Sequence, residues 1–530
     1  MNRTSRWAWL VPLAGALACS APGTAAKKSS TSEALAPAVR RLSAPELDAA
    51  AAPVLGRPLA LSAKLPPDTR QFDFSRNVAQ TVDSLTLRTL YDAVASESAR
   101  LDLAAAPFPS CAAHASVADR ACAASTVSAL ARQAFRRTPT GAELDSLGAL
   151  FAAGADGADF GAGAALVVRA LLGSAKFLYT TALGDGSASA GPFTLSDDEL
   201  ASELALLISG RPPDDDLLAG AAAGELRVGA NREAWAIRLL QEADSRFLYR
   251  RFVEEWFGIV RLDGLAKSSA VVSDFPVLRQ AMFDETSAFI DDVMVTQQGS
   301  LSALLAGGYS IVPAPLAGFY GIQPTAPGTR VAVDQLGRLG ILQQGAFLAT
   351  FAHETESAPV QRGKAVLERL LCATLAKPTD LKIDIVFPAP DENATTRERY
   401  KNHATDPMCS GCHDYLDGVG FTFENFDAVG RARATESGRP VDTSGHIALA
   451  GKTVSLNDSL DLSRALAESE EVRQCAARQV VRFAAGQGAL GVEFAFADSV
   501  GRLSFERRGS VLGLFLEFVK SDWFATRSSP

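Results

Sequence analysis

Two cysteines and a histidine within five residues form the most specific chemical pattern in the chain. Cys409 and Cys412 are separated by two residues, and His413 follows directly. This Cys-x-x-Cys-His spacing is typical of c-type haem attachment, in which two thiols bond to the macrocycle and the imidazole ligates the iron. At the cysteine and histidine content of this chain, chance would give the pattern about once in a thousand sequences. We therefore expect covalent haem c on these three residues.

The residues around this motif predict the short helix that would carry it. Asp406 is a good N-cap, Pro407 is a good first helical residue, and Gly418 suits the helix exit. At about 100° per residue, the three motif side chains fall within an arc of roughly 100°. Both sulfurs and the imidazole would then reach one macrocycle from the same face of the helix.

The second axial ligand of the iron is left open by the sequence. Small cytochromes take this ligand from Met or His, and all four methionines lie at or before Met408. His353 and His403 are the upstream candidates, and His446, the only later histidine, ranks below them. A five-coordinate iron would instead permit peroxide or small-ligand chemistry.

Two further sets of residues could complete a haem site or belong to the ordinary fold. Four apolar side chains could shield the macrocycle or pack in a core: Val419, Phe421, Phe423 and Phe426. Three basic side chains could pair with haem propionates or lie at the surface: Arg362, Arg431 and Arg433.

Two other kinds of site compete with haem at the motif. One is a structural zinc site that uses His403, Cys409, Cys412 and one further ligand, and the other is a simple disulfide between the two cysteines. Zinc sites usually pair a Cys-x-x-Cys with a distant second pair of ligands. The chain has no second Cys-x-x-Cys and no His pair, so its sequence favours haem.

The N-terminus has the pattern of an export signal. Arg3 and Arg6 precede a 12-residue apolar run from Trp7 to Ala18, which is too short to span a bilayer as a helix. Cys19 follows directly and resembles a bacterial lipidation site, and ordinary signal-peptidase cleavage is the alternative. The expected N-terminal segments are a lipoprotein-type signal peptide over 1–19 and a flexible tether over 20–39.

Four further cysteines are candidates for disulfides, which persist in exported proteins. Cys111 and Cys122 flank a short polar loop, and Cys372 and Cys475 are the other natural pair. The sequence does not decide the pairing, because four cysteines allow three connectivities. Buried free thiols are the alternative.

The composition describes a folded and mildly acidic protein. Its 530 residues include 51 basic and 60 acidic ones, without the basic surplus that nucleic-acid binding usually requires. Apolar residues recur at helical spacing behind two capping boxes, Thr140 to Glu143 and Ser196 to Glu199. We expect a mainly α fold of several small helical domains, with a short β-hairpin near 435–457.

Residues 338 to 433 resemble a known family of proteins. The stretches that carry the resemblance include Ala358 to Lys364, Leu370 to Cys372, His403 to His413 and Glu424 to Arg431. They resemble a bacterial family of exported, multi-domain proteins of unknown function that is built around a cytochrome-c-like haem motif. The family is typical of planctomycetes and myxobacteria.

Other stretches between residues 40 and 525 resemble companion domains of the same family. The resemblance implies five small, mainly helical domains and carries the three motif residues over as haem attachment residues. Two positions depart from the family pattern, because Gly418 stands where a proline is usual and His446 where an acidic residue is usual. The expected domains are helical ones over 40–105, 106–185, 190–325 and 441–530, and a haem-motif domain over 336–440.

These observations predict an electron carrier rather than an enzyme, with haem-dependent redox activity left open. We expect an outer-membrane lipoprotein, in the periplasm or at the cell surface, that passes single electrons to an unknown redox or cell-envelope protein. It would touch the membrane through its N-terminal lipid anchor and would not bind nucleic acid. The alternative is a non-redox surface binding or structural protein in which the motif region is a disulfide or metal staple. No Gly-x-Ser-x-Gly, His-Glu-x-x-His or P-loop motif supports a hydrolase.

Overall fold

A computed structural model describes most of the chain. The expected signal peptide over 1–19 with its lipidation site Cys19, and most of the expected tether over 20–39, lie outside the described residues. His403 and the expected helix cap Asp406 also lie outside them. The described residues are 34–157, 159–186, 191–241, 246–375, 391, 393–401, 405 and 407–529.

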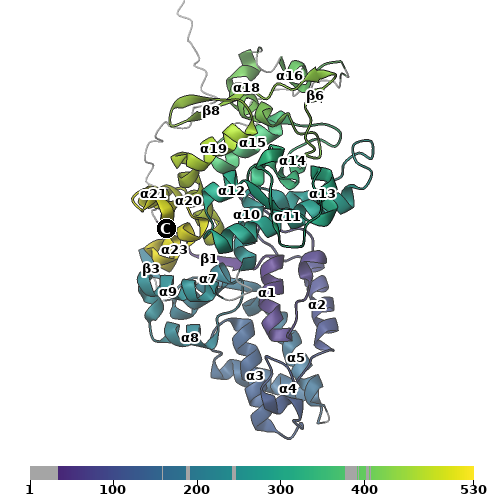
Figure 1. Cartoon of the computed structure of the whole chain (residues 1–530). Helices are drawn as coiled ribbons and strands as arrows, with labels where there is room; N and C mark the ends of the chain where they lie inside the picture. The colour runs from purple at the N-terminus through teal and green to yellow at the C-terminus, as the bar shows by residue number, and fades with distance from the viewer. Residues whose placement is uncertain are drawn as a thin grey trace, which may run out of the picture.

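The described chain folds mainly into α-helices joined by short antiparallel strand pairs, which confirms the expected mainly α fold. Figure 1 shows an elongated molecule with the N-terminal helices at one end and the motif helix, α18 (Pro407–Gly420), at the other. The C-terminal strand β10 (Thr526–Ser529) returns to the middle, where it pairs with β3 (Gly191–Thr194). The motif is therefore far from the N-terminal helices.

A first hydrophobic core lies within the N-terminal helices. Its buried side chains run from Leu42 to Leu178 along the chain, and Leu206 joins them from a later helix. The segments expected as separate domains over 40–105 and 106–185 share this core. The elements around it are β1 (Ala38–Arg41), α1 (Ala44–Leu55), α2 (Ser84–Ser98), α3 (Arg120–Phe135), α4 (Gly141–Ala155), α5 (Phe160–Leu172), α6 (Ala175–Leu178) and β2 (Tyr179–Ala182).

A second and larger core joins the remaining described elements. It takes Phe74 from the N-terminal segment and then runs from Ala182 to Ala525. The segments expected over 190–325, 336–440 and 441–530 share it. The elements up to residue 350 are β3, α7 (Asp197–Ile208), α8 (Asp215–Ala222), α9 (Gly229–Leu240), α10 (Arg246–Trp256), α11 (Phe275–Thr296), α12 (Leu301–Ala306), β4 (Tyr309–Ile311), α13 (Ala314–Tyr320), β5 (Arg330–Ala332) and α14 (Gly345–Thr350). The later elements are α15 (Pro359–Leu370), α16 (Thr396–Arg399), α18, β6 (Thr435–Glu436), β7 (Arg439–Pro440), β8 (Gly445–Leu449), β9 (Lys452–Leu456), α19 (Ser459–Glu468), α20 (Glu470–Ala485), α21 (Leu490–Val500), α22 (Phe505–Arg508), α23 (Val511–Lys520), α24 (Asp522–Ala525) and β10.

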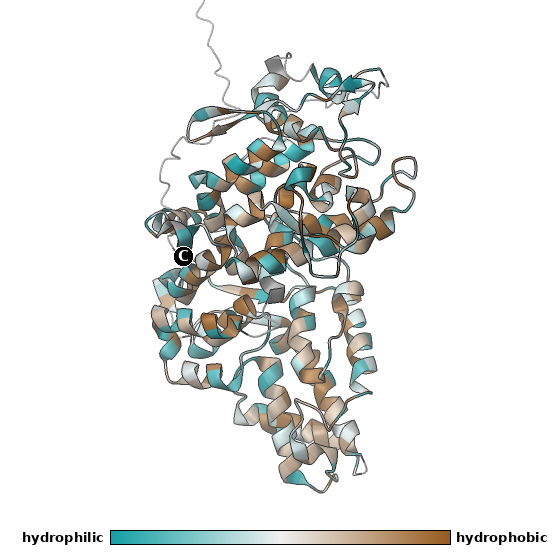
Figure 2. Cartoon of the chain, viewed as in Figure 1, coloured by the Kyte–Doolittle hydropathy of each residue, from teal (hydrophilic) through white to brown (hydrophobic). Residues whose placement is uncertain are grey.

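The distribution of hydropathy follows these cores. Figure 2 shows apolar residues gathered along the central helices, whereas hydrophilic residues dominate around α16 and β6 near the motif end. In the part of the chain that the structure describes, no helix combines the length and the apolar character that crossing a membrane requires.

Two expected helix starts are confirmed at their capping boxes. Thr140 caps α4 and Ser196 caps α7, and in each box a glutamate three residues later bonds back to the cap. This arrangement satisfies backbone N–H groups that the first helical turn leaves unpaired. Behind the second box, Leu200, Leu204 and Ile208 are fully buried, as the helical spacing predicts.

The region expected to hold one β-hairpin contains two antiparallel pairs. β6 pairs with β7, and β8 pairs with β9 in a register that places His446 opposite Ser455. Ile447, the next residue of β8, is buried and belongs to the second core. The alternation along β8 therefore turns His446 to the other face of this strand pair.

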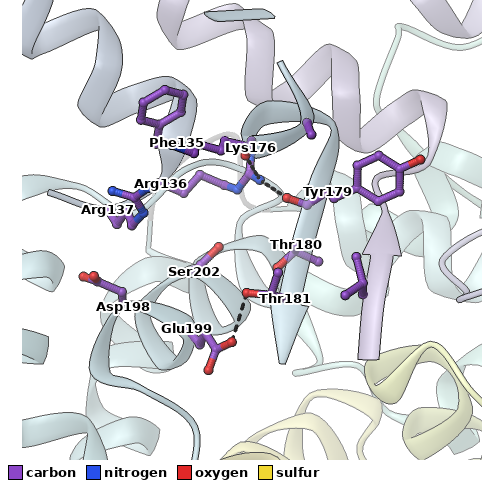
Figure 3. A pocket seen from close by; sticks show the side chains of 12 residues that line it. Phe135, Arg136, Arg137, Lys176, Tyr179, Thr180, Thr181, Asp198, Glu199 and Ser202 are labelled. Carbon is purple, nitrogen blue, oxygen red and sulfur yellow. Dashed lines mark hydrogen bonds between the residues drawn. The ribbon is translucent and has the colours of Figure 1, made fainter. Parts of the chain in front are cut away.

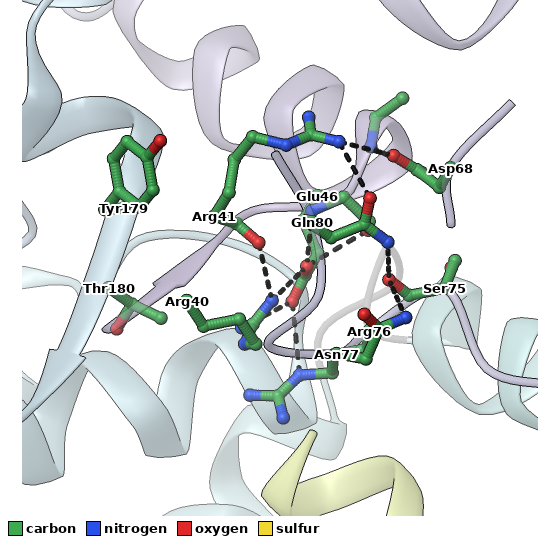
Figure 4. A network of polar contacts seen from close by, with 12 residues as sticks. Arg40, Arg41, Glu46, Asp68, Ser75, Arg76, Asn77, Gln80, Tyr179 and Thr180 are labelled. Atoms are coloured by element: carbon green, nitrogen blue, oxygen red, sulfur yellow. Dashed lines mark hydrogen bonds and ion pairs between the residues drawn. The ribbon is translucent and has the colours of Figure 1, made fainter. Parts of the chain in front are cut away.

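A buried cluster of charged side chains joins the two cores (Figure 4). Glu46 on α1 accepts hydrogen bonds from Arg40 at 2.6 Å and from Arg76 at 3.1 Å. Arg76 also donates to Glu203 on α7 at 3.0 Å and to the backbone carbonyl of Ala484. Burial alone would raise the pKa of Glu46, but the two arginines outweigh it and lower this pKa to about 2. The cluster therefore ties the N-terminal segment to helices from both later parts of the chain.

Two disulfides confirm the pairs expected from the sequence. Cys111 is bonded to Cys122, and Cys372 is bonded to Cys475. The first closes a short loop beside α3. The second connects the end of α15 to α20, so it fastens the chain just before the motif segment to the C-terminal helices.

Replacing Glu46 by Gln should strongly destabilise the protein, because Arg40 and Arg76 would keep their charges without this buried counter-charge. Breaking a buried ion pair from one side costs about 3–5 kcal/mol. Urea unfolding at neutral pH measures the loss. Asp215→Asn is the control, because the pair of Asp215 with Arg132 is at the surface and contributes about 0–1 kcal/mol. Equal losses for the two variants would contradict the role of the cluster.

The pH dependence of this difference follows from the sign of the shift. In the fold the pKa of Glu46 is lowered from 4.5 to about 2. The stability that its charge contributes is therefore complete above pH 4.5 and is lost as the pH falls towards 2. The free-energy difference between wild type and Glu46→Gln should shrink across this window, and a difference that does not change with pH would contradict the assignment.

Removing the two disulfides should have unequal effects, because they close loops of different length. The sequence separation is 103 residues for Cys372 and Cys475 and 11 residues for Cys111 and Cys122. On the loop-entropy estimate, a 100-residue loop contributes about 4.7 kcal/mol and a 15-residue loop about 3 kcal/mol. Urea unfolding of the two double Cys→Ala variants should show the larger loss for the long loop, and the reverse order would contradict this reasoning.

Candidate functional site

The motif helix α18 packs directly on α15. At two points the two backbones touch, with no side chain between them. A methyl group added at Gly363 would lie 2.0 Å from the carbonyl oxygen of Leu416. One added at Gly420 would lie 2.0 Å from the carbonyl oxygen of Pro359. Residue numbers change in opposite directions at these points, so the helices run antiparallel. The C-terminal half of α18 is held at a distance that only glycine permits.

The helix ends two residues later than its sequence predicts. Gly418, expected at the exit, lies inside α18, which continues to Gly420. A methyl group at Gly418 would lie 2.8 Å from Cε1 of His446 on β8. The expected exit is therefore wrong, because this glycine allows close packing of a strand and does not turn the chain.

The three motif residues lie in the N-terminal half of α18. Cys409, Cys412 and His413 are each half-buried, and the side chain of His413 keeps 20% of its exposure. At about 100° per residue they share one face of the helix. The disulfide alternative requires a bond between Cys409 and Cys412. Cys409 is a free cysteine, so the structure does not contain this bond. The motif is displayed along one partly exposed face.

Asp417 lies one turn after His413 on the same helix. Its Oδ1 lies 3.1 Å from Nδ1 of the imidazole, and its side chain keeps only 7% of its exposure. When this carboxylate is ionised it can only accept a hydrogen bond, and in that state Nδ1 is the donor. Nε2 is then the nitrogen whose lone pair can ligate a metal. The motif itself does not point to Asp417, although its i+4 spacing from His413 could have done so.

His353, a candidate axial ligand, lies towards the other end of α18. Its Nδ1 is 3.4 Å from the side-chain amide nitrogen of Gln361, in the first turn of α15. That turn contacts Gly420, the last residue of α18. The structure therefore does not bring His353 to the half of α18 that carries the cysteines.

His446 contacts α18 on the face opposite the motif. It packs against Gly418, and its Nε2 lies 3.6 Å from Oδ1 of Asp414. Both positions lie on the far side of the helix from the cysteines at about 100° per residue. His403, the remaining candidate, lies outside the described residues.

Arg362 is fully buried and holds the segment that follows α18. Its guanidinium donates to the backbone carbonyls of Phe423, Phe426 and Asp427 at 3.0, 3.0 and 2.7 Å. Burial lowers the pKa of Arg362 to about 10, although Glu424 lies 3.9 Å away. Neither expected role holds, because this arginine is not at the surface and its donors are engaged by main-chain carbonyls.

The other residues considered for the haem surroundings are also engaged in the fold. Arg433 pairs with Glu424 at 2.9 Å, and Arg431 pairs with Asp427 at 3.4 Å. The four apolar side chains are buried, so core packing is the interpretation that holds: Val419, Phe421, Phe423 and Phe426.

The described residues contain no ready metal cluster of ordinary side chains. Among them, no group of three or more His, Cys, Asp or Glu could hold a metal ion. The zinc alternative depends on His403, which lies outside this part of the chain.

A cavity of about 460 Å³ lies in the N-terminal part of the molecule (Figure 3). Arg136 at its wall donates to the carbonyl of Tyr179 at 2.7 Å, and Thr181 donates to Glu199 at 2.9 Å. A second cavity, of about 800 Å³, lies between the end of α1 and α3. Residues of α18 line neither cavity, so both are separate from the motif.

Three family models match parts of the chain. Residues 122–181 match PSD5, a protein of unknown function (DUF1595), and residues 195–322 match PSD4, a protein of unknown function (DUF1592). Residues 338–436 match PSCyt3, a protein of unknown function (DUF1588). Together the matches cover somewhat more than half of the chain and indicate a multi-domain family of unknown function. No curated protein and no solved structure matches the chain.

The three matches follow the order of the fold. They run from α3 to β2, from α7 to α13, and from the segment before α14 to β6. The last contains the motif and both helices of the glycine contact. The resemblance stated from the sequence is confirmed for a multi-domain family of unknown function, while the haem motif and the bacterial group stay predictions.

Gly363→Ala should destabilise the protein, because its methyl group would meet the backbone of α18 at Leu416. Overpacking of this kind costs typically about 1–3 kcal/mol. Gly411→Ala is the matched control on α18, because nothing lies within 4 Å of its added methyl group. Alanine also favours a helix over glycine by up to about 1 kcal/mol, so the control should be neutral or stabilising. Thermal unfolding checks the pair, and equal effects would contradict the backbone contact.

Proposed function

We propose that the chain is an exported haem c protein that carries single electrons. The observation that carries the proposal is the Cys-x-x-Cys-His motif from Cys409 to His413, on a partly exposed helix face. The other half of this helix is fastened to α15 through glycine contacts. The family model over residues 338–436 is named PSCyt3, and this name hints at cytochrome-like families.

Cys409 and His413 fit a covalently attached haem as they stand, whereas Cys412 is disulfide-bonded in this structure and would have to be reduced before its sulfur could form a thioether. The two cysteines and the imidazole share one face, and Asp417 engages Nδ1 of His413, so Nε2 is the nitrogen that would ligate iron. When bound, the group would supply one-electron exchange between ferric and ferrous iron. The chain's own part is to hold the attachment residues on a helix that cannot slide, because its C-terminal half is locked on α15.

The second axial ligand is the open part of this site. His353 and His446 do not lie on the motif's half and face of α18. His403 is therefore the remaining proposed ligand among the histidines considered. A five-coordinate iron is the arrangement expected if His403 does not reach it.

The proposed location is the cell envelope. The export signal with Cys19 supports a lipid-anchored protein of the outer membrane, in the periplasm or at the cell surface. The two disulfides support an oxidising compartment, because such bonds are rare in the cytosol. The proposed partner is a redox or cell-envelope protein that accepts or donates one electron.

The test is to express the exported chain in cells that mature c-type cytochromes. Wild type should gain the mass of one haem on the intact polypeptide and show a haem c absorption spectrum after denaturation. Cys409→Ser should change the spectrum to that of a single thioether, and replacing both cysteines should abolish covalent attachment. His413→Ala should lose the native ligation spectrum.

His446→Ala is the matched histidine control, because His446 packs against the opposite face of α18. Its spectrum should equal that of wild type. A wild-type mass equal to bare polypeptide would overturn the haem proposal and favour a non-redox surface or structural protein.

A further inference from the structure

Asp417 is a buried carboxylate whose interactions are unusually few. Its Oδ1 lies 3.1 Å from Nδ1 of His413, whereas its buried Oδ2 has no hydrogen-bond partner in the described part of the chain. Within the same residues it forms no ion pair with an arginine or lysine. Among the described residues, the imidazole of His413 is therefore the one group that Asp417 hydrogen-bonds, and the charge of Asp417 also acts on the phenol of Tyr400.

This environment contrasts with that of two other buried carboxylates in the molecule. Glu46 is paired with two arginines, and Glu424 pairs with Arg433 at 2.9 Å. Burying a charged group without compensation is costly, so side chains at such positions normally have a counter-charge or several donors. Burying the Asp417 carboxylate against one histidine costs free energy that stabilising a helix turn alone would not offset.

We infer that Asp417 is a positioning residue for the iron ligand: it fixes the ring of His413, keeps the proton on Nδ1 and lowers the reduction potential of the haem. This inference rests on the proposed function. A carboxylate that accepts from the second ring nitrogen makes the imidazole a more basic ligand. A more basic ligand and a nearby negative charge both favour ferric over ferrous iron, and hydrogen bonding behind the ligand is a known lever on potential.

Asp417 and His413 lie on different halves of α18, and this placement determines how Asp417 can hold the imidazole ring. Asp417 lies where α18 passes from its partly exposed half to the half locked against α15, next to Leu416, whose carbonyl meets Gly363. The carboxylate is thus carried by the half of α18 that packs directly on α15, and the imidazole that it contacts is on the half that would hold the haem. A shift of the ring would require Asp417 to lose its hydrogen bond.

The decisive experiment compares the reduction potentials of haem-loaded wild type and three variants. Asp417→Asn removes the charge at nearly constant size, and Asp417→Glu retains the charge. Asp414→Asn is the matched control, because Asp414 is on the same helix next to His413 but its side chain is 68% exposed and faces His446. Each of the two Asn variants removes one negative charge, so a general charge effect would move both alike.

Asp417→Asn should shift the ferric–ferrous equilibrium about tenfold towards ferrous, which is a rise of about 59 mV for one electron. Asp414→Asn should shift it much less, because solvent screens an exposed charge. Asp417→Glu should restore part of the wild-type value. Before haem loading, nitrogen NMR of histidine-labelled wild type should show the Nδ1–H tautomer of His413. Asp417→Asn should show a smaller share of this tautomer, because a neutral amide oxygen is a weaker acceptor than a carboxylate.

The outcomes separate this inference from the proposed function. A wild-type chain that acquires no haem overturns both. Haem-loaded variants in which Asp417→Asn matches Asp414→Asn overturn the inference alone, as does an unchanged tautomer of His413. Asp417→Asn protein that loads haem, melts like wild type and shows the higher potential supports a role beyond helix stability.

Discussion

The direct contact of two helix backbones is the constraint on which the region around the motif depends. At Gly363 and Gly420 the main chains of α15 and α18 meet where even a methyl group would collide with a carbonyl oxygen. A contact of this kind leaves no freedom for one helix to slide or rotate against the other, because protein interiors are close-packed. The position of every side chain along α18 is thereby set relative to the second core.

Buried charged side chains on α15 and in the segment after α18 also hold this region together. Arg362, next to Gly363 on α15, ties the segment after α18 through three carbonyl groups, and Ser357 and Arg433 both donate to the carboxylate of Glu424. The chain segments that carry the family resemblance, around Arg362 and around Glu424, are thus two halves of one interaction. The two segments need each other, because the buried guanidinium of Arg362 requires the acceptors that the segment around Glu424 supplies.

The helix α18 divides into two halves with different tasks. Its C-terminal half packs against α15 and β8 through residues that are glycine or deeply buried. Its N-terminal half presents the motif residues at partial exposure, and Asp417 connects the halves by holding the ring of His413 from the buried side. For the proposed electron carrier, this rigid support would keep the geometry of the attachment residues the same in both charge states.

Much of the local structure followed from the residues themselves. The capping boxes at Thr140 and Ser196 start helices as predicted, and Pro407 begins α18, because such signals act through neighbouring backbone groups. The sequence also predicted the motif and the mainly α class, since spacing and periodicity are local properties. The sequence offered the two disulfide pairs without deciding between the possible connectivities, and the structure decided them.

The tertiary structure alone decided how these local parts are used. Gly418 had the signal of a helix end, yet it lies inside α18 because β8 approaches it, and no neighbour in sequence reports that approach. Arg362 was expected at a surface or a propionate, but the fold buries it among carbonyls from residues about 60 positions away. Likewise, the shared cores and the side of α18 that His446 occupies depend on long-range packing. The sequence by itself determined the motif and the helix that carries it, because both depend on residues within a few turns, and the haem chemistry proposed for the motif rests on this local pattern. Only the fold decided which side chains surround that chemistry, since contacts between distant segments arise from the packing of the whole chain.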